Sequence, residues 1–109
     1  MEIIVSGRHL PVSDDLKTYV EGRLGKLDVL HAKLTHARVI LDHEKIEQKA
    51  EVTLTGKNMN LVARAESEDM YASIDQAIEK LEKQLHKHME KLHEHHGEQK
   101  LRDLDPDGA

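Results

Sequence analysis

Residues 69–92 have the sequence DMYASIDQAIEKLEKQLHKHMEKL, and this stretch decides how the rest of the chain can fold. Its apolar residues recur at steps of three and four, which places them on one stripe of a helix at about 100° per residue. They are Met70, Ile74, Ala77, Ile78, Leu81, Leu85, Met89 and Leu92. The pattern predicts a long amphipathic helix that needs another surface against which to bury its stripe.

The charges on this helix separate by sign on either side of the stripe. Four carboxylates flank one side, at Asp75, Glu79, Glu82 and Glu90, and four lysines line the other, at Lys80, Lys83, Lys87 and Lys91. A solvated helix face usually interleaves opposite charges, whereas a row of ammonium groups on a rigid helix suits the backbone of a polyanion. The lysines are therefore candidate phosphate contacts, with an ordinary solvated face as the alternative.

The composition limits the class of protein. At 109 residues the chain can build one domain with one two-layer core, and the absence of cysteine excludes disulfides and cysteine zinc sites. It shows no signal-peptide pattern and no apolar run long enough to span a membrane, so we expect a cytoplasmic protein. The net charge of −5 means that any anion binding must come from segregated charge, and two tyrosines without Phe or Trp argue against base stacking.

The first third of the chain predicts a strand followed by a helix. Residues 1–6 contain a short apolar run that ends at Gly7, and Ser13 followed by two aspartates gives a helix N-cap with favourable charges in the first turn. The apolar stripe of this helix comprises Leu16, Tyr19, Val20, Leu24, Leu27 and Leu30. Arg23 and Lys26 lie at its edge and add two candidate phosphate contacts.

Two glycines weaken the same helix, at Gly22 and Gly25. Each costs about 1 kcal/mol relative to Ala in a helix interior. Close approach of another backbone, from the protein or from a nucleic acid, would explain them; simple tolerance of a poor helix former is the alternative.

From Thr35 the apolar period changes from 3.6 to 2. Three alternating runs, at 35–42, 49–55 and 60–66, predict successive strands of an antiparallel meander. The expected fold is therefore α+β, a two-layer β-α-β-β-β-α domain in which both helices pack on one face of a four-stranded sheet. This layout is similar to double-stranded-RNA-binding domains, and side-by-side helices could merge their cations into a single basic groove.

The chain divides into a folded part and a tail. We expect residues 1–96 to form the domain and residues 97–109, GEQKLRDLDPDGA, to be a disordered acidic extension. The tail carries four carboxylates and two cations, a net charge of −2.

The residues at the start of the long helix resemble a known family. The run Glu68-Asp69-Met70-Tyr71-Ala72-Ser73-Ile74-Asp75, followed by Lys80-Leu81 and Gln84-Leu85, is similar to the signature of ribosome hibernation promoting factors and ribosome-associated inhibitors, also called sigma-54 modulation proteins. The resemblance extends to residues 23–27 and to Glu44-Lys45, and covers residues 1 to about 95.

This resemblance implies a domain that binds the small ribosomal subunit, at the 16S rRNA of the messenger and transfer RNA channel. It assigns rRNA contacts to basic residues of both helices, matched here by Arg23, Lys26, Lys80, Lys83, Lys87 and Lys91. The acidic residues of the second helix make it more mixed in charge than strongly basic family members. The chain resembles the short form of the family, which lacks a second, dimerising domain.

The resulting hypothesis is a hibernation factor that silences translation, promotes ribosome dimers together with the small ribosome modulation factor, and is a monomer off the ribosome. One alternative is an inhibitor-type paralogue that keeps ribosomes as inactive monomers, because such proteins also continue into an acidic extension. Another is a protein-interaction module that modulates transcription.

Metal and enzyme hypotheses find less support. The histidines at 86, 88, 93, 95 and 96 invite a metal site, but none of them are paired at i, i+4, so we expect no physiological metal or cofactor. The chain has no glycine-rich phosphate loop, no nucleophile motif and no cysteine, which argues against an enzyme and against a small-molecule substrate. Asp69 and Asp75 are acidic residues that could be catalytic. Their positions, at the N-cap and in the opening turns of the helix, give them a structural explanation instead.

Overall fold

The computed structural model describes residues 1–30 and 33–94, and the side chains of residues 28–30 and 89–94 lie outside that description. The elements follow in the order β1 (Glu2–Arg8), α1 (Asp14–Leu30), β2 (Leu34–Glu44), β3 (Glu47–Gly56), β4 (Met59–Ser67) and α2 (Met70–Glu94). The predicted order is confirmed, with strand ends within about two residues of those expected. The tail at 97–109 lies outside the described residues.

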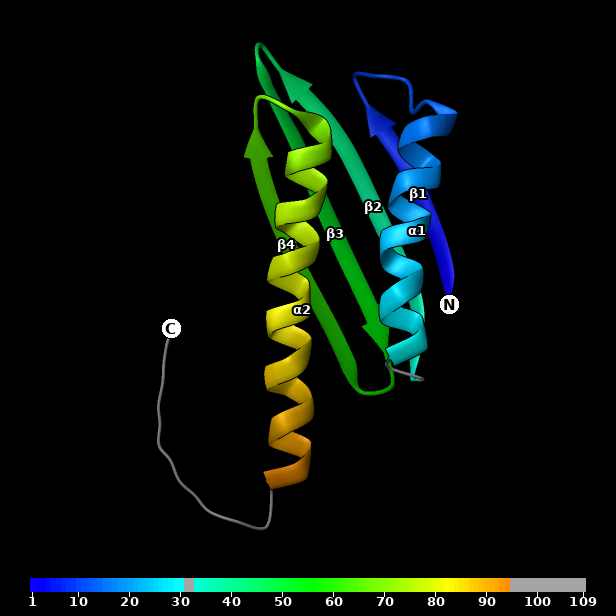
Figure 1. Ribbon diagram of the computed structural model, residues 1–109, viewed down its shortest axis with the longest axis vertical. Coiled ribbons are helices and arrows are strands. Elements are labelled where there is room, and N and C mark those ends of the chain that lie inside the picture. The colour runs from blue at the N-terminus through cyan, green and yellow to red at the C-terminus, as the bar shows by residue number, and fades with distance from the viewer. Residues whose placement is uncertain (31–32, 95–109) are drawn as a thin grey trace.

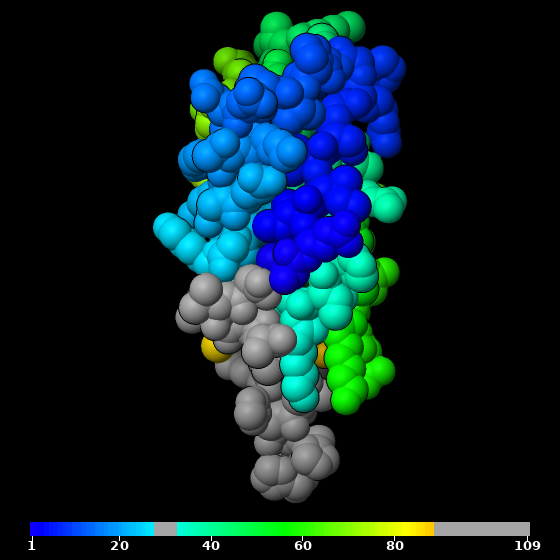
Figure 2. Space-filling view, turned by 90° about the vertical axis from the view of Figure 1, so that its right-hand side faces the viewer, coloured from blue at the N-terminus to red at the C-terminus, as the bar shows by residue number. Residues whose placement is uncertain are grey.

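The four strands form one sheet in the order β1-β2-β3-β4. β1 runs parallel to β2, and α1 supplies the long crossover that a parallel pair requires, whereas β2, β3 and β4 form the predicted antiparallel meander. Lys45 and Asn58, in the two hairpin turns, take a left-handed backbone with φ of 58°. Both helices cover the same face of the sheet (Figure 1), and an edge-on view shows α1 and the sheet as two layers (Figure 2).

The core lies between the sheet and the helices, where alternate strand residues meet the two apolar stripes. The largest fully buried apolar side chains are Val20, Leu24, Leu27, Val39, Leu41, Val52, Leu54, Ile74, Ile78, Leu81 and Leu85. Burying one such side chain is worth roughly 1.5–3 kcal/mol, so these contacts hold both helices on the sheet. The predicted members Leu30, Met89 and Leu92 have side chains outside the description.

The start of α1 has the predicted cap. Ser13 Oγ accepts a hydrogen bond from the backbone N–H of Leu16 at 3.1 Å. Asp14 and Asp15 occupy the first turn, where the helix dipole favours negative charge. The capping prediction is therefore confirmed.

A buried serine fixes the start of α2. Among the described residues, Ser73 is the polar side chain that is buried, with no exposed surface. Its hydroxyl donates to the carbonyl of Gln48 in β3 at 2.6 Å and lies 2.8 Å from Ser67 Oγ at the end of β4. A buried polar group without a partner would cost about 1–3 kcal/mol, so these bonds restrict the rotation of α2 about its axis.

Replacing Ser73 by Ala should lower the free energy of unfolding by about 1–2 kcal/mol, because the Gln48 carbonyl loses this donor and better helix propensity recovers only a few tenths. Urea unfolding followed by circular dichroism measures the difference. The control is Ser6→Ala, an exposed serine of β1, which should change the same free energy by less than about 0.5 kcal/mol. Equal stabilities for the two variants would contradict the role assigned to the Ser73 hydroxyl.

Candidate nucleic-acid interface

One side of α2 faces the outer edge of the sheet. Lys80 Nζ donates to the carbonyl of Arg64 at 2.7 Å, and Gln84 Nε2 donates to the carbonyl of Val62 at 3.0 Å. Both carbonyls belong to β4, an edge strand of the sheet. Of the predicted phosphate contacts, Lys80 is therefore already engaged in holding the helix to the sheet.

Lys83 and Lys87 continue along this helix, one turn apart and exposed. They lie three and seven residues after Lys80, so they share its side of α2 but stand farther from the sheet. A shallow hollow of about 500 Å³ is lined by both lysines together with Glu79, Glu82 and His86. The side chain of Lys91, the fourth predicted lysine, lies outside the description.

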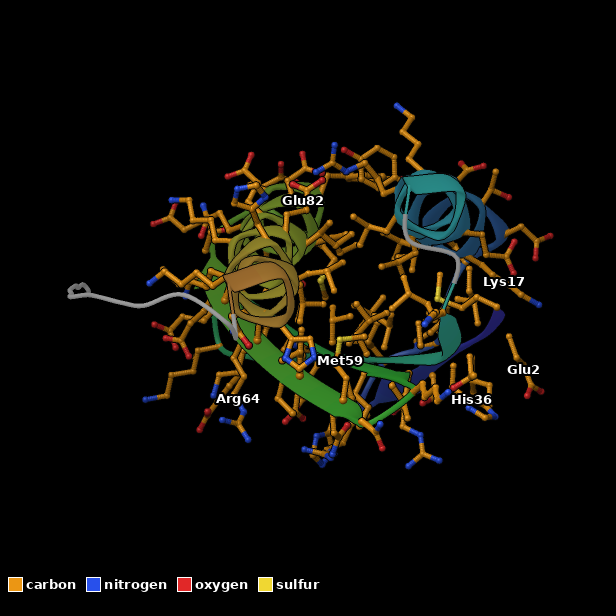
Figure 3. All side chains as sticks on the ribbon, turned by 90° about the horizontal axis from the view of Figure 1, so that it is seen from below. Glu2, Lys17, His36, Met59, Arg64 and Glu82 are labelled. Atoms are coloured by element: carbon orange, nitrogen blue, oxygen red, sulfur yellow. The ribbon has the colours of Figure 1, made fainter. Side chains whose placement is uncertain are left out.

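The opposite side of α2 faces α1 and carries carboxylates. Tyr19 of α1 donates to Asp75 Oδ1 at 2.7 Å, and Arg23 Nε lies 3.3 Å from the same oxygen. Glu82 also lies on the outer surface of α2 toward α1 (Figure 3).

The prediction of one basic groove between the helices is therefore wrong. The acidic and lysine rows lie side by side on the exposed surface of α2, where Glu79 and Glu82 share a hollow with Lys83 and Lys87, and packing turns the acidic row toward α1. Arg23 and Lys26 on α1 are consequently separated from Lys83 and Lys87 by a row that includes Asp75 and Glu82. The described cations lie on the helix layer in two strips, Arg23 with Lys26 on α1 and Lys83 with Lys87 on α2, and the second is called the lysine strip below.

Arg23 is held by an ion pair rather than by a well-formed hydrogen bond. Its side chain is 29% exposed, and its Nε is buried without a hydrogen-bond partner among the described residues. The ring of Tyr71 packs edge-on against that of Tyr19, with centroids 4.9 Å apart. Asp75 thus links α1 and α2, a role that its predicted place in the opening turns did not suggest. Lys26, one turn further along α1, is exposed.

The two glycines of α1 are not explained by packing within the protein. A Cβ added at Gly22 or Gly25 would meet nothing within 4 Å. Close approach of another protein segment, one of the predicted explanations, is therefore wrong for the described residues. What remains is an approach by an external partner, or tolerance of glycine. The glycines leave a smooth strip on α1 beside Arg23 and Lys26.

Sequence reasoning missed two features of the charge distribution. Lys33 and Lys57 are exposed and adjacent, since the N–H of Lys57 donates to the carbonyl of Lys33 at 3.2 Å. At the other end of the sheet, a hollow of about 450 Å³ is acidic and is lined by Glu44, Lys45, Ile46, Glu47, Glu66, Ser67 and Glu68. Charge therefore changes sign along the molecule, which the strand register explains but sequence spacing alone does not show.

Other kinds of site find no support in the part of the chain that is described. No group of three His, Asp or Glu side chains there is arranged to hold a metal ion. None of the described helices combines the length and the apolar character needed to cross a membrane.

Similarity to known proteins identifies the family of this chain. The family model of the sigma 54 modulation protein / S30EA ribosomal protein matches residues 3–93. The chain belongs to this family. It is 43% identical over 91 residues to the ribosome hibernation promoting factor of Pseudomonas putida, covering 84% of this chain and 89% of that protein. It is 33% identical to the Escherichia coli K12 protein of the same name, over 87% of this chain and all of that one.

A solved structure agrees with this assignment to the sigma 54 modulation protein / S30EA ribosomal protein family. A ribosomal subunit interface protein from Coxiella burnetii superposes with a TM-score of 0.79 at 26% identity, covering 84% of this chain and 100% of that one. The resemblance predicted from residues 68–75 is thereby confirmed, together with the fold that it implied.

The hydrogen bond between Tyr19 and Asp75 predicts that the stability of the fold depends on pH. The hydrogen bond to the Asp75 carboxylate is the main cause that raises the pKa of Tyr19 above its ordinary value, and burial adds to it. Because the pKa is raised in the folded state, the stabilisation is present below the ordinary tyrosine pKa and is lost as pH rises through the raised value.

In a Tyr71→Phe background, which leaves Tyr19 as the single tyrosine, ultraviolet titration should place the pKa of Tyr19 above the ordinary value. Adding Asp75→Asn should lower this pKa, because the neutral amide no longer disfavours the phenolate. Glu79→Gln removes one exposed carboxylate from the same helix and should leave the titration unchanged. If Asp75→Asn leaves the pKa of Tyr19 unchanged, the hydrogen bond between the two side chains is not formed in solution.

Proposed function

We propose that this protein is a ribosome hibernation factor that binds the small ribosomal subunit, in the channel for messenger and transfer RNA. The observation that carries the proposal is the family match over residues 3–93, with relatives named ribosome hibernation promoting factor. The name of the solved relative, a ribosomal subunit interface protein, supports the same type of partner.

The exposed cations supply the chemistry for such binding. Lys83, Lys87 and Lys26 are exposed ammonium groups on rigid helices, which suits contacts to phosphates rather than to base edges. Phosphate contacts do not depend on sequence, so recognition rests on the shape of folded RNA and on the spacing of its backbones. The open strip at Gly22 and Gly25 allows an RNA backbone to come close to α1.

The protein then acts by occupancy. A domain lodged in the channel excludes messenger and transfer RNA, so translation stops without a chemical step, a cofactor or a small-molecule substrate. In this proposal the protein works in the cytoplasm on 16S rRNA near the decoding region, and Arg23, Lys80 and Lys91 are secondary contacts. Lys80 would have to give up its bond to β4 before it could bind a phosphate.

Reversing the charge of Lys83 and Lys87 together should abolish binding to small subunits, because two phosphate contacts are replaced by two repulsions. Sedimentation with purified small subunits measures this, and the circular dichroism spectrum should not change. Neutral variants at the same positions should reduce the slope of log K against log salt by about 0.7–0.9 for each lost contact.

The matched control reverses Lys17 and Lys45, which changes the total charge by the same amount. Both are exposed, Lys17 on the outer flank of α1 and Lys45 at the acidic end of the sheet (Figures 1 and 3). This control should sediment with small subunits at low salt, although more weakly than the unaltered protein. Equal loss in both pairs would mean that total charge matters and that the lysine strip is not the interface. No cosedimentation of the unaltered protein would favour the interaction module that modulates transcription.

We further propose that the bound ribosomes pair, together with ribosome modulation factor, as expected for a hibernation promoting factor rather than an inhibitor-type paralogue. Removing residues 97–109 should leave ribosome dimers unchanged, because a segment with a net charge of −2 is repelled by RNA phosphates and adds little affinity. Gradient profiles of ribosomes with the full and shortened chains make the comparison. Dimers that appear only after the truncation would identify an inhibitor-type protein.

A further inference from the structure

No described element covers the face of the sheet that points away from the helices. Figure 3 shows Glu2, His36 and Arg64 on this side, opposite the layer that holds α1 and α2. The strand register places Ile4, Arg38, Thr53 and Val62 in one row across all four strands. Ile4 is 44% exposed and Val62 is 38% exposed, so this row is accessible at both ends.

The two carboxylates nearest to Arg38 lie against other side chains. Glu51 accepts from Arg64, with Nε at 3.0 Å and Nη2 at 2.9 Å. Glu2 lies 3.7 Å from His36 Nε2. These are the two carboxylates on the diagonals next to Arg38; Glu51 is neutralised by Arg64, and neither carboxylate forms an ion pair with Arg38 among the described residues.

Arg38 is left as an exposed guanidinium without an ion pair among the described residues. Its direct neighbours across the strands are Ile4 and Thr53, neither of which can neutralise it. Beside it lies a hollow of about 330 Å³, whose lining includes Ile4, His36, Arg38, Thr53, Thr55 and Asn60. The hollow thus combines one unpaired positive charge with several hydrogen-bonding side chains.

We propose that this hollow binds the backbone of an RNA strand, with Arg38 on a phosphate and the polar side chains around it on the adjoining ribose and phosphate oxygens. The inference rests on the proposed function, and it adds a second RNA-binding side, on the layer opposite the lysine strip. A domain that contacts RNA through both layers bridges two RNA surfaces, as an occupant of an RNA-lined channel must.

The chemistry of the hollow favours RNA over a protein partner. The centres of protein interfaces are depleted in charge and rich in aromatic side chains, whereas this face holds an unpaired arginine and no aromatic residue. An arginine fork matches the geometry of phosphate oxygens, and threonine, asparagine and histidine side chains are common partners of phosphate and sugar.

The test compares two arginines of the same face, by sedimentation of the full chain with purified small ribosomal subunits. Arg38→Gln should weaken binding about five- to tenfold and lower the salt slope by about 0.7–0.9. The control, Arg64→Gln combined with Glu51→Gln, removes the neighbouring ion pair as a whole, so no carboxylate is freed beside Arg38, and it should weaken binding less than about twofold. Arg38→Lys should recover part of the affinity because the charge is kept.

Cross-linking identifies the occupant of the hollow. The chain has no cysteine, so Asn60→Cys gives a single attachment point for a photoreactive group at its rim. Cross-links to rRNA support the proposal, whereas cross-links only to ribosomal proteins, or none from bound protein, overturn it. Equal effects of Arg38→Gln and of the Glu51→Gln, Arg64→Gln double variant also overturn it while leaving the proposed function intact. An unaltered chain that fails to bind subunits overturns both.

Discussion

The rotation of α2 about its own axis decides where the charges of this protein lie. The stripe from Ile74 to Leu85 is buried against the sheet, and the hydroxyl of Ser73, bonded to Gln48, holds the first turn in place. With that rotation set, the acidic side of the helix faces α1 and the lysine side follows the outer edge of β4. The same burial that stabilises the fold therefore distributes the charges that a polyanion would meet.

The edge of β4 shows how a charged side chain can serve the fold. An uncovered edge strand offers free carbonyls and N–H groups with which another chain can pair. Lys80 and Gln84 donate to two of these carbonyls, and the ammonium group also makes the edge unattractive to a neighbouring strand. Sequence alone places Lys80 among the candidate phosphate contacts. In the structure its ammonium group holds α2 to the edge of the sheet.

The sequence predicted the element order, the Ser13 cap, the two apolar stripes and the family, because each depends on local spacing or on a contiguous motif. It did not predict the link from Asp75 to Tyr19 and Arg23, since that link depends on which side of α2 meets α1. The basic groove failed for the same reason. The sequence does not distinguish Arg38 from other outward strand residues. The structure does, because Glu51, a carboxylate on the diagonal next to it, is paired with Arg64.

The opposite charges at the two ends of the molecule affect how the protein is oriented as it approaches a polyanion. A hollow lined by four glutamates lies at one end of the sheet, and Lys83 and Lys87 lie far along α2 toward the other (Figure 1). In the field of a polyanion such a body experiences a torque, even though its net charge is repelled. Within a Debye length of about 8–10 Å the torque turns the lysine end foremost before any contact forms. Productive encounters then become more frequent at low salt, so the on-rate should fall as ionic strength rises, the opposite of the trend that the net charge of −5 alone predicts.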